Sequence, residues 1–178
     1  MPNQLWTVGH STLPLEELLA LLEGPGIQQL CDVRAVPRSR RHPQFSANSL
    51  ALSLPDRGIA YRHLARLGGW RHARADSPNT AWRNAAFRGY ADYALSDEFA
   101  DVLRELCDLA IDRPTAIMCA EALWWRCHRR LIADRLLAAG WEVCHIDSHG
   151  RSSRHELPDF AVVRPDGSVI YPQTPELV

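Results

Sequence analysis

The sequence predicts a single α/β domain, residues 1–178, with a mostly parallel sheet of about five strands, helices on both faces (Rossmann-like) and a C-terminal β-hairpin. Three observations predict this fold class. Short apolar runs alternate with helical segments of about ten to fifteen residues. The run TAIMC at 115–119 is almost wholly apolar, which is typical of a strand buried on both faces. Asp166-Gly167 separates two β-rich runs within residues 160–171, which is a strong hairpin signal.

Five apolar or β-branched runs are expected to form the sheet. The first, LWTVG, ends at Gly9, and the second, IQQLCDV, leads directly into Val33 and Arg34. The expected strands cover residues 5–9, 27–33, 59–65, 115–119 and 141–147.

Capping and breaking residues delimit the helices between these runs. Pro14 is tolerated in a first helical turn, and Gly24-Pro25-Gly26 ends that helix. Ser96 or Asp97 is a good N-cap for the third helix. Residues 67–89 have no sustained period and are expected to form a long loop, of a kind that is commonly functional in a compact domain. The expected helices cover residues 14–23, 47–54, 97–110 and 120–139.

Composition favours a cytoplasmic protein with no membrane partner. No stretch approaches the roughly 20 apolar residues needed to cross a bilayer, and the N-terminus lacks the pattern of a signal peptide. The five cysteines are odd in number and several lie in apolar runs, so we expect reduced thiols.

Charge is unevenly distributed along the chain. All 20 basic residues are arginines, which excludes Schiff-base and Walker-type lysine chemistry. Residues 34–88 contain eleven arginines against Asp56 and Asp76, a local charge of +9, so the remainder must carry −10 to reach the net −1. Such a segment suits a phosphate-bearing partner, although a solvated face balanced by acidic helices gives the same numbers.

The carboxyl ends of parallel strands form the usual ligand-binding edge of such a sheet. Three segments follow strands at this edge: Gly9-His10-Ser11, Asp32-Val33-Arg34 and Cys119-Ala120-Glu121. We therefore expect their side chains to converge on one site.

Five ordered motifs carry a family resemblance: TVGHS at 7–11, DVRAVPRSR at 32–40, LGG at 67–69, FRGYADY at 87–93, and CAE with CHR within 119–129. Together they resemble the bacterial family called domain of unknown function 488, over a family-like core of about residues 5–150. The resemblance supports the choice of site residues but implies no reaction. Members commonly have proline between the last two elements, where this chain has Trp124-Trp125, which suggests a subgroup with an aromatic wall.

Cys119 is the expected nucleophile. It ends a buried strand and is expected to lie at the start of the next helix, where free N–H groups and the helix dipole stabilise a thiolate. His10, Glu121 and His128 are the expected proton-transfer groups. The alternative is that Cys119 is only a small core residue.

Cys119, Cys127 and His128 are also candidate metal ligands, although their spacing is not that of a tight Cys-X2-Cys pair. His128 has a more ordinary interpretation as a structural hydrogen-bond donor between layers. No motif identifies a cofactor.

Arginines after the second strand form a candidate anion clamp, because guanidinium groups bind phosphate in bidentate fashion. Alternatively, Asp32 pins Arg34 or His10 and Ser39 caps a turn. Aromatic and basic residues alternate in the long loop, which suits stacking on bases, or else the aromatics pack onto the core. The substrate-binding candidates are Ser11, Asp32, Arg34, Arg38, Ser39, Arg40, Trp82, Arg88, Tyr90 and Arg129.

The leading hypothesis is a cysteine-dependent transferase or hydrolase that acts on a phosphate-bearing substrate: a nucleotide, a nucleic acid or a small phosphorylated molecule. The alternatives are a non-catalytic nucleic-acid or nucleotide-binding module and a metal-binding protein.

Overall fold

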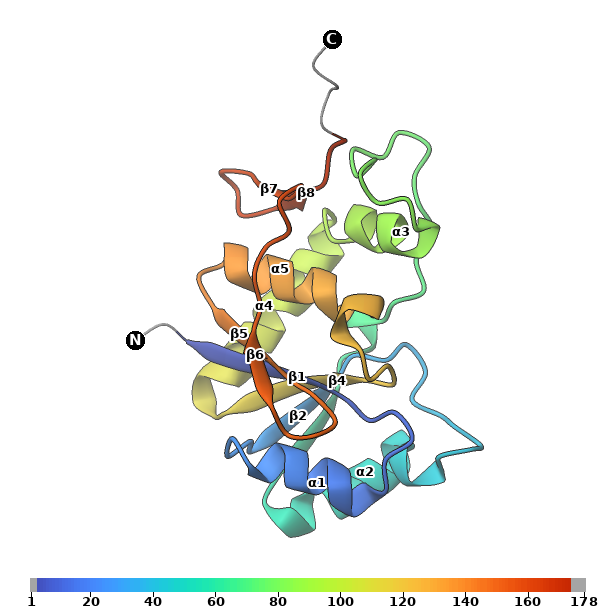
Figure 1. The fold of residues 1–178 in the computed structure, drawn as a ribbon, viewed down its shortest axis with the longest axis vertical. Helices are drawn as coiled ribbons and strands as arrows, with labels where there is room; N and C mark the ends of the chain where they lie inside the picture. The colour runs from blue at the N-terminus through green and yellow to red at the C-terminus, as the bar shows by residue number, and fades with distance from the viewer. Residues whose placement is uncertain (1–2, 174–178) are drawn as a thin grey trace.

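A computed structural model describes residues 3–173 of the protein and confirms the predicted fold class. One sheet has the strand order β3-β2-β4-β1-β5-β6, with β1 to β5 parallel and β6 antiparallel to β5 (Figure 1). The strands are β1 (Gln4–Gly9), β2 (Gln29–Asp32), β3 (Ala60–His63), β4 (Thr115–Cys119), β5 (Glu142–Ile146) and β6 (Ser152–Arg154).

All five predicted strands are present, and β6 is an additional edge strand that the sequence analysis missed. Its three residues, Ser-Ser-Arg, are all exposed, so no apolar periodicity marked it. An exposed, polar and very short edge strand also resists pairing with other chains.

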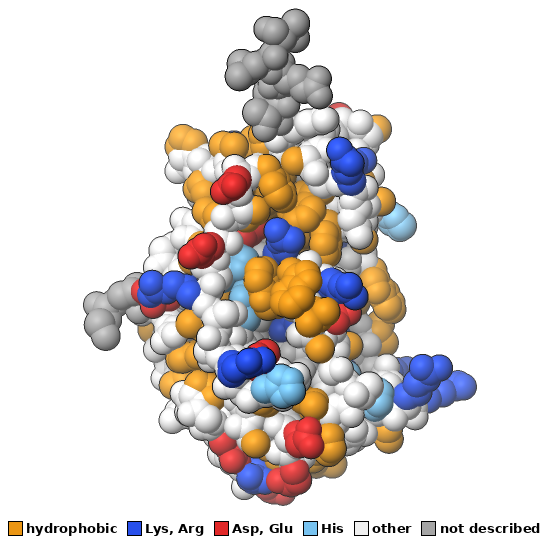
Figure 2. All heavy atoms as spheres, viewed as in Figure 1, with side chains coloured by type: hydrophobic (Ala, Val, Ile, Leu, Met, Phe, Trp, Pro, Cys, Tyr) orange, Lys and Arg blue, Asp and Glu red, His pale blue; other side chains and the backbone are white. Residues whose placement is uncertain are grey.

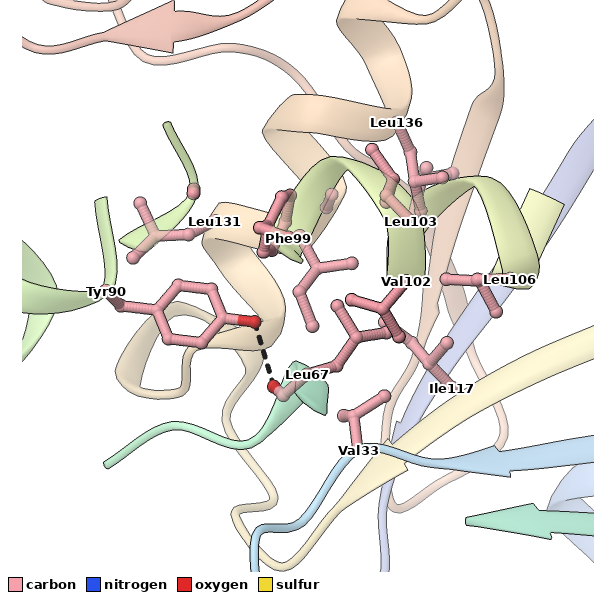
Figure 3. Close-up of a cluster of buried hydrophobic side chains, with 14 of the residues drawn as sticks. Val33, Leu67, Tyr90, Phe99, Val102, Leu103, Leu106, Ile117, Leu131 and Leu136 are labelled. Atoms are coloured by element: carbon pink, nitrogen blue, oxygen red, sulfur yellow. Dashed lines mark hydrogen bonds between the residues drawn. The ribbon is translucent and has the colours of Figure 1, made fainter. Parts of the chain in front are cut away.

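The helices cover the two faces of the sheet as predicted. Helices α1 (Leu15–Glu23) and α2 (Ala47–Ser53) lie on one face, and α4 (Asp97–Asp112) and α5 (Arg129–Ala138) on the other (Figure 1). Ser96 caps α4 by accepting a hydrogen bond from the Phe99 backbone N–H. One apolar cluster fills each side, and Figure 3 shows the cluster beneath α4 and α5.

The expected long loop at 67–89 contains part of a further helix, α3 (Ala85–Tyr93). The Asn84 side chain caps it by accepting from the N–H groups of Ala86 and Phe87. Gly89 lies inside this helix. Its position has no room for a side chain, because a Cβ there would lie 2.4 Å from the Arg71 carbonyl oxygen. The central glycine and the short length concealed the helical period.

The segment after β4 also differs from prediction. Residues 120–128 form a loop with one short 3-10 helix (Trp124–Arg126), and α5 begins only at Arg129. Cys119 therefore lies well before the start of α5 in the chain. The dipole of this helix does not stabilise a Cys119 thiolate directly, contrary to the expectation from the sequence.

The predicted hairpin is present as β7 (Val162–Val163) and β8 (Val169–Ile170), with Gly167 at φ 82° in its turn. The residue after β8, Tyr171, attaches the hairpin to α5 through its hydroxyl, which donates to Asp134. Within residues 3–173, none of the helices combines the length and apolar character that a membrane span requires.

Candidate functional site

The carboxyl ends of β1, β2 and β4 open onto a cavity of about 660 Å³. Its walls come from the loops after these strands, from Gly69 and Trp70, and from the first turn of α3. The predicted site residues that line it are His10, Ser11, Arg34, Arg38, Ser39, Cys119, Glu121 and His128, together with the metal candidate Cys127.

Gly9 lets β1 and the loop after β4 approach closely. A Cβ at this position would lie 1.9 Å from the Glu121 carbonyl oxygen. The backbone pairing then continues past the strand ends, because the N–H groups of His10 and Ser11 donate to the Cys119 and Ala120 carbonyls at 3.0 Å. These bonds hold His10 beside Cys119.

Asp32 and Arg34 form a buried bidentate ion pair below the cavity. Arg34 donates from Nε to Asp32 Oδ1 at 2.8 Å and from Nη2 to Oδ2 at 2.6 Å. Tyr61 donates its hydroxyl to the same carboxylate at 2.6 Å. Burial alone would lower the pKa of Arg34, but the hydrogen bonds and charge of Asp32 raise it.

His10 lies between this ion pair and the cavity. Its Nε2 lies 3.2 Å from Arg34 Nη1, and its Nδ1 lies 2.9 Å from the Ser11 carbonyl oxygen. The carbonyl can only accept, so Nδ1 carries the proton and Nε2 accepts from Arg34. Burial, reinforced by the charge of Arg34, lowers the pKa of His10. Both ring nitrogens of His10 are therefore engaged, and the ring is held against Arg34.

Cys119 and Cys127 meet at the cavity wall. Their sulfur atoms lie 2.6 Å apart, and each residue is more than nine-tenths buried. The Cys127 sulfur also lies 3.4 Å from His128 Nδ1 and accepts from the Arg129 backbone N–H at 3.4 Å. That N–H belongs to the free N-terminus of α5, so the helix end supports Cys127 and not Cys119.

His128 is fixed by its other nitrogen. Nε2 lies 2.8 Å from the Val33 carbonyl oxygen and must donate to it, which turns Nδ1 toward Cys127. Gly69 leaves room for the ring, because a Cβ there would lie 2.7 Å from Nδ1. When both nitrogens are protonated, His128 donates to the carbonyl and to the sulfur together.

The two cysteines differ in acidity. Burial raises the pKa of Cys119, and the hydrogen bond that its thiol donates to Cys127 raises it further. Burial by itself would also raise the pKa of Cys127. The hydrogen bonds from Cys119 and His128 and the charges of His128 and Arg129 instead lower it well below the ordinary value. These directions favour Cys127 over Cys119 as the more acidic of the two thiols.

Arg129 is a buried cation whose charge acts on Cys127. It is 1% exposed, and its guanidinium donates to Thr7 Oγ1 at 3.2 Å and to the carbonyls of Glu121 and Ala122 at 2.5 and 3.5 Å. Its Nε has no hydrogen-bond partner, and no described carboxylate pairs with the side chain. A buried cation without a carboxylate is costly, and the charge of Arg129 is one of the causes that lower the pKa of Cys127.

A chain of buried hydrogen bonds extends from Arg129 to Asp134. Thr7 Oγ1 lies 2.7 Å from His145 Nδ1, His145 Nε2 lies 2.9 Å from His155 Nδ1, and His155 Nε2 lies 2.6 Å from Asp134 Oδ1. Burial, helped by the charge of His155, lowers the pKa of His145 to about 2. These hydrogen bonds connect Arg129 to the Asp134 carboxylate through side chains that are all buried, which holds Arg129 in place.

Replacing Tyr171 with phenylalanine is expected to lower the free energy of unfolding by about 1–3 kcal/mol, because Asp134 Oδ2 would lose its 2.6 Å hydrogen bond in a buried site. Urea denaturation measures the change. Tyr93→Phe is the control, since its hydroxyl bonds the Arg66 carbonyl at the surface, and we expect about 0.5 kcal/mol or less. Equal losses of unfolding free energy in the two variants would show that the buried hydrogen bond of Tyr171 contributes no more to stability than the surface hydrogen bond of Tyr93.

The family model described as "Domain of unknown function DUF488" matches residues 14–136. The chain belongs to this family. The match confirms the resemblance noted in the sequence motifs and spans β2, β4 and the paired cysteines. No curated protein and no solved structure matches the chain.

The sequence analysis missed several residues that line the cavity of this DUF488 protein. Arg126, Trp70 and His42 face it, and Trp70 is 80% exposed. Arg38 and Arg126 make no ion pair or side-chain hydrogen bond with any described residue. Among residues 3–173, Glu121 contributes the only carboxylate on the wall, against Arg34, Arg38 and Arg126, so the described wall of the DUF488 cavity has a net positive charge.

Six predicted substrate-binding residues lie outside the cavity wall. Asp32 is buried under Arg34, and Arg129 is buried behind Cys127. Trp82 packs at the core against Phe160 and Tyr171, because this part of the chain lies over α5. The other three are Arg40, which is exposed; Arg88, which donates to the Trp82 carbonyl; and Tyr90, which donates to the Leu67 carbonyl inside the core (Figure 3).

Figure 2 shows basic side chains projecting at the edge of the molecule over the loop between β2 and α2, which Figure 1 places at the right. This loop contains Arg40 and Arg41, both exposed. They extend the positive charge of the DUF488 cavity outward along the rim.

The metal alternative has little geometric support. Among residues 3–173, no group of three or more His, Cys, Asp or Glu side chains is placed to hold a metal ion. His128 Nε2, moreover, is already committed to the Val33 carbonyl.

Proposed function

We propose that the protein is a cysteine-dependent transferase or hydrolase that acts on a small phosphate-bearing substrate, with Cys127 as the nucleophile. One observation carries the proposal: two cysteines whose sulfur atoms lie 2.6 Å apart line the same cavity as the unpaired guanidinium groups of Arg38 and Arg126, and the surroundings of Cys127 lower its pKa. Strongly perturbed groups gathered in a cleft are typical of active sites.

Substrate binding in this proposal depends on the free arginines. Arg38 and Arg126 offer bidentate donors to a phosphate. Arg34 contributes less, because four of its five N–H groups are already used by Asp32, Phe45 and His10. Its remaining Nη1 hydrogen faces the cavity that Arg34 lines.

In the reaction, the Cys127 sulfur attacks the electrophilic atom of the substrate, and a bond from sulfur to that atom forms as the leaving group departs with its bonding pair. The leaving group takes the proton of the Cys119 thiol, whose sulfur lies 2.6 Å from the reacting sulfur. Water or another acceptor then displaces Cys127 from the covalent intermediate. The proton of that acceptor returns to Cys119, which restores the starting state.

Alkylation with iodoacetamide across pH tests the nucleophile. We expect Cys127 to be modified with an apparent pKa below the ordinary value of about 8.5, and Arg129→Met to raise it. Peptide mass spectrometry assigns the modified residue. An ordinary apparent pKa at Cys127, or faster modification of Cys119, would contradict the proposal.

Inorganic phosphate tests the anion site. We expect it to slow alkylation of Cys127, and Arg38→Ala and Arg126→Ala each to weaken this protection roughly tenfold or more, as charge-assisted hydrogen bonds are lost. Arg104→Ala is the matched control, because Arg104 is an exposed residue of α4 that does not line the cavity. This variant should leave the protection by phosphate unchanged. Equal protection of all three variants would show that phosphate does not bind at Arg38 and Arg126.

A second candidate, a nucleotide or nucleic-acid binding module, is favoured by exposed Trp70 at the rim beside Arg38, Arg40 and Arg41. Burial of Trp82 and Tyr90 removes two of the expected stacking residues. Under this candidate, Trp70→Ala weakens binding of a single-stranded oligonucleotide while Cys127→Ser leaves it unchanged.

A further inference from the structure

We propose that Cys127 and Cys119 form a reversible disulfide when the protein meets a hydroperoxide, with Cys127 as the residue oxidised first and Cys119 as the resolving thiol. This is a modification site independent of any substrate turned over in the cavity. It depends on the contact between the sulfurs, on their access from the cavity and on the charges around them.

The two sulfurs need little movement to bond. They lie 2.6 Å apart, and a disulfide requires about 2.05 Å. Cys119 ends β4, whereas Cys127 closes the loop at 120–127, whose Trp125 and Arg126 are exposed. A loop at the surface can take up a shift of this size while the strand stays in place.

Both residues line the cavity, so a small peroxide reaches them from solvent. The other three cysteines lack this setting. Burial raises the pKa of Cys31 to about 12 and that of Cys107 to about 11. Cys144 lies on β5, where its sulfur accepts a hydrogen bond from Gln4. None of the three lines the cavity.

The first step joins the Cys127 sulfur to the distal oxygen of the hydroperoxide. The S–O bond forms and the O–O bond breaks, and the alkoxide that leaves takes the proton of the Cys119 thiol. The products are a sulfenic acid at Cys127, an alcohol and a thiolate at Cys119. Sulfur is oxidised and the peroxide is reduced, by two electrons.

In the second step the Cys119 thiolate attacks the Cys127 sulfur. The S–S bond forms, the S–O bond breaks and hydroxide leaves. The overall change converts one thiolate, one thiol and one hydroperoxide into a disulfide, an alcohol and hydroxide. Two equivalents of an external thiol, such as reduced glutathione, reverse it by exchange.

Arg129 makes the disulfide easy to reduce. Oxidation removes the negative charge on Cys127 that the charge of Arg129 favours, and leaves this buried guanidinium without it. A dithiol whose reduced form is stabilised in this way has a disulfide that readily accepts electrons. We therefore expect the reduced form to return under mild thiol.

The test treats the full chain with hydrogen peroxide, blocks remaining thiols and digests it without reductant. We expect free thiols to fall from five to three, and a peptide containing Cys119 to be linked to one containing Cys127. Glutathione should restore all five. Cys107→Ser and Cys144→Ser are matched controls that keep the crosslink.

Two variants separate the roles. In Cys119→Ser, dimedone should label Cys127 as a trapped sulfenic acid, and in Cys127→Ser neither label nor crosslink should form at the same peroxide concentration. A crosslink to another cysteine, dimedone on Cys119, or five free thiols after treatment would overturn the proposal. Since no substrate or phosphate is present, failure of the proposed enzyme activity leaves this result unaffected.

Discussion

Replacing Asp32 with asparagine is expected to lower the free energy of unfolding by about 3–5 kcal/mol, the usual cost of removing one partner of a buried ion pair. Arg34 would remain buried with its charge uncompensated. The amide also presents a donor where the carboxylate accepted hydrogen bonds from Arg34 and Tyr61.

Urea denaturation of the wild type and Asp32→Asn measures this loss. Asp76→Asn is the matched control, because Asp76 pairs with Arg74 at the surface, where both side chains are more than half exposed. We expect the control to change the unfolding free energy by less than about 1 kcal/mol. Asp32→Asn within 1 kcal/mol of the wild type would mean that the pair does not hold this edge of the sheet together.

The stability of the protein is expected to pass through a maximum near the ordinary thiol pKa of about 8.5. The pKa of Cys127 is lower in the folded than in the unfolded chain, so its contribution is complete above the unfolded value and is lost as pH falls toward the folded value. Within that window the unfolded state binds one proton more, and stability rises by roughly 1.4 kcal/mol per pH unit.

Cys119 changes the stability of the protein with pH in the opposite direction. Its pKa is raised in the folded chain, so above about 8.5 the unfolded state has lost a proton that the folded state keeps. Stability then falls with a similar slope. His10 and His145, whose pKa values are lowered, add a loss of stability below about 6.5.

Urea denaturation at a series of pH values from 6 to 10, for the wild type and Cys127→Ser, isolates the cysteine contribution. The difference between the two proteins should grow by roughly 1.4 kcal/mol per pH unit up to about 8.5 and then level off. Cys107→Ser serves as the control and should run parallel to the wild type below about pH 8.5, because burial raises the pKa of Cys107 to about 11 and its contribution to the pH dependence begins only above that range. A constant difference between the wild type and Cys127→Ser would show that Cys127 does not ionise in this window.

The strands were predictable because apolar run length and flanking turn residues are local properties. The run at 115–119 is β4, with all five residues buried. The rule that ligands bind at the carboxyl edge of a parallel sheet then brought the segments after β1, β2 and β4 to one place, although they are far apart in the chain. Helix α3 escaped detection because the packing of Gly89 against Arg71 is a tertiary contact.

The identity of the acidic cysteine was not predictable from local pattern. Cys119 directly precedes the helix expected at 120–139 and Cys127 lies within it, whereas α5 begins only at Arg129, after both cysteines. The charge distribution depends on Arg129, on the Val33 carbonyl that orients His128, and on the Cys119 hydrogen bond. Trp70 and Trp82 likewise lie in chain segments of similar composition, but only Trp82 packs against Tyr171, next to the hairpin, and is buried.

The sequence by itself determined the α/β class, the order of the strands along the chain and the edge at which the polar motifs gather, because these follow from hydrophobic periodicity and from the geometry of parallel sheets. Only the tertiary structure decided which cysteine has the lowered pKa and which arginines on the cavity wall lack a partner among the described residues. Both depend on burial and on hydrogen-bond partners contributed by distant segments, and electrostatic energies in a low-dielectric interior change steeply over a few ångströms.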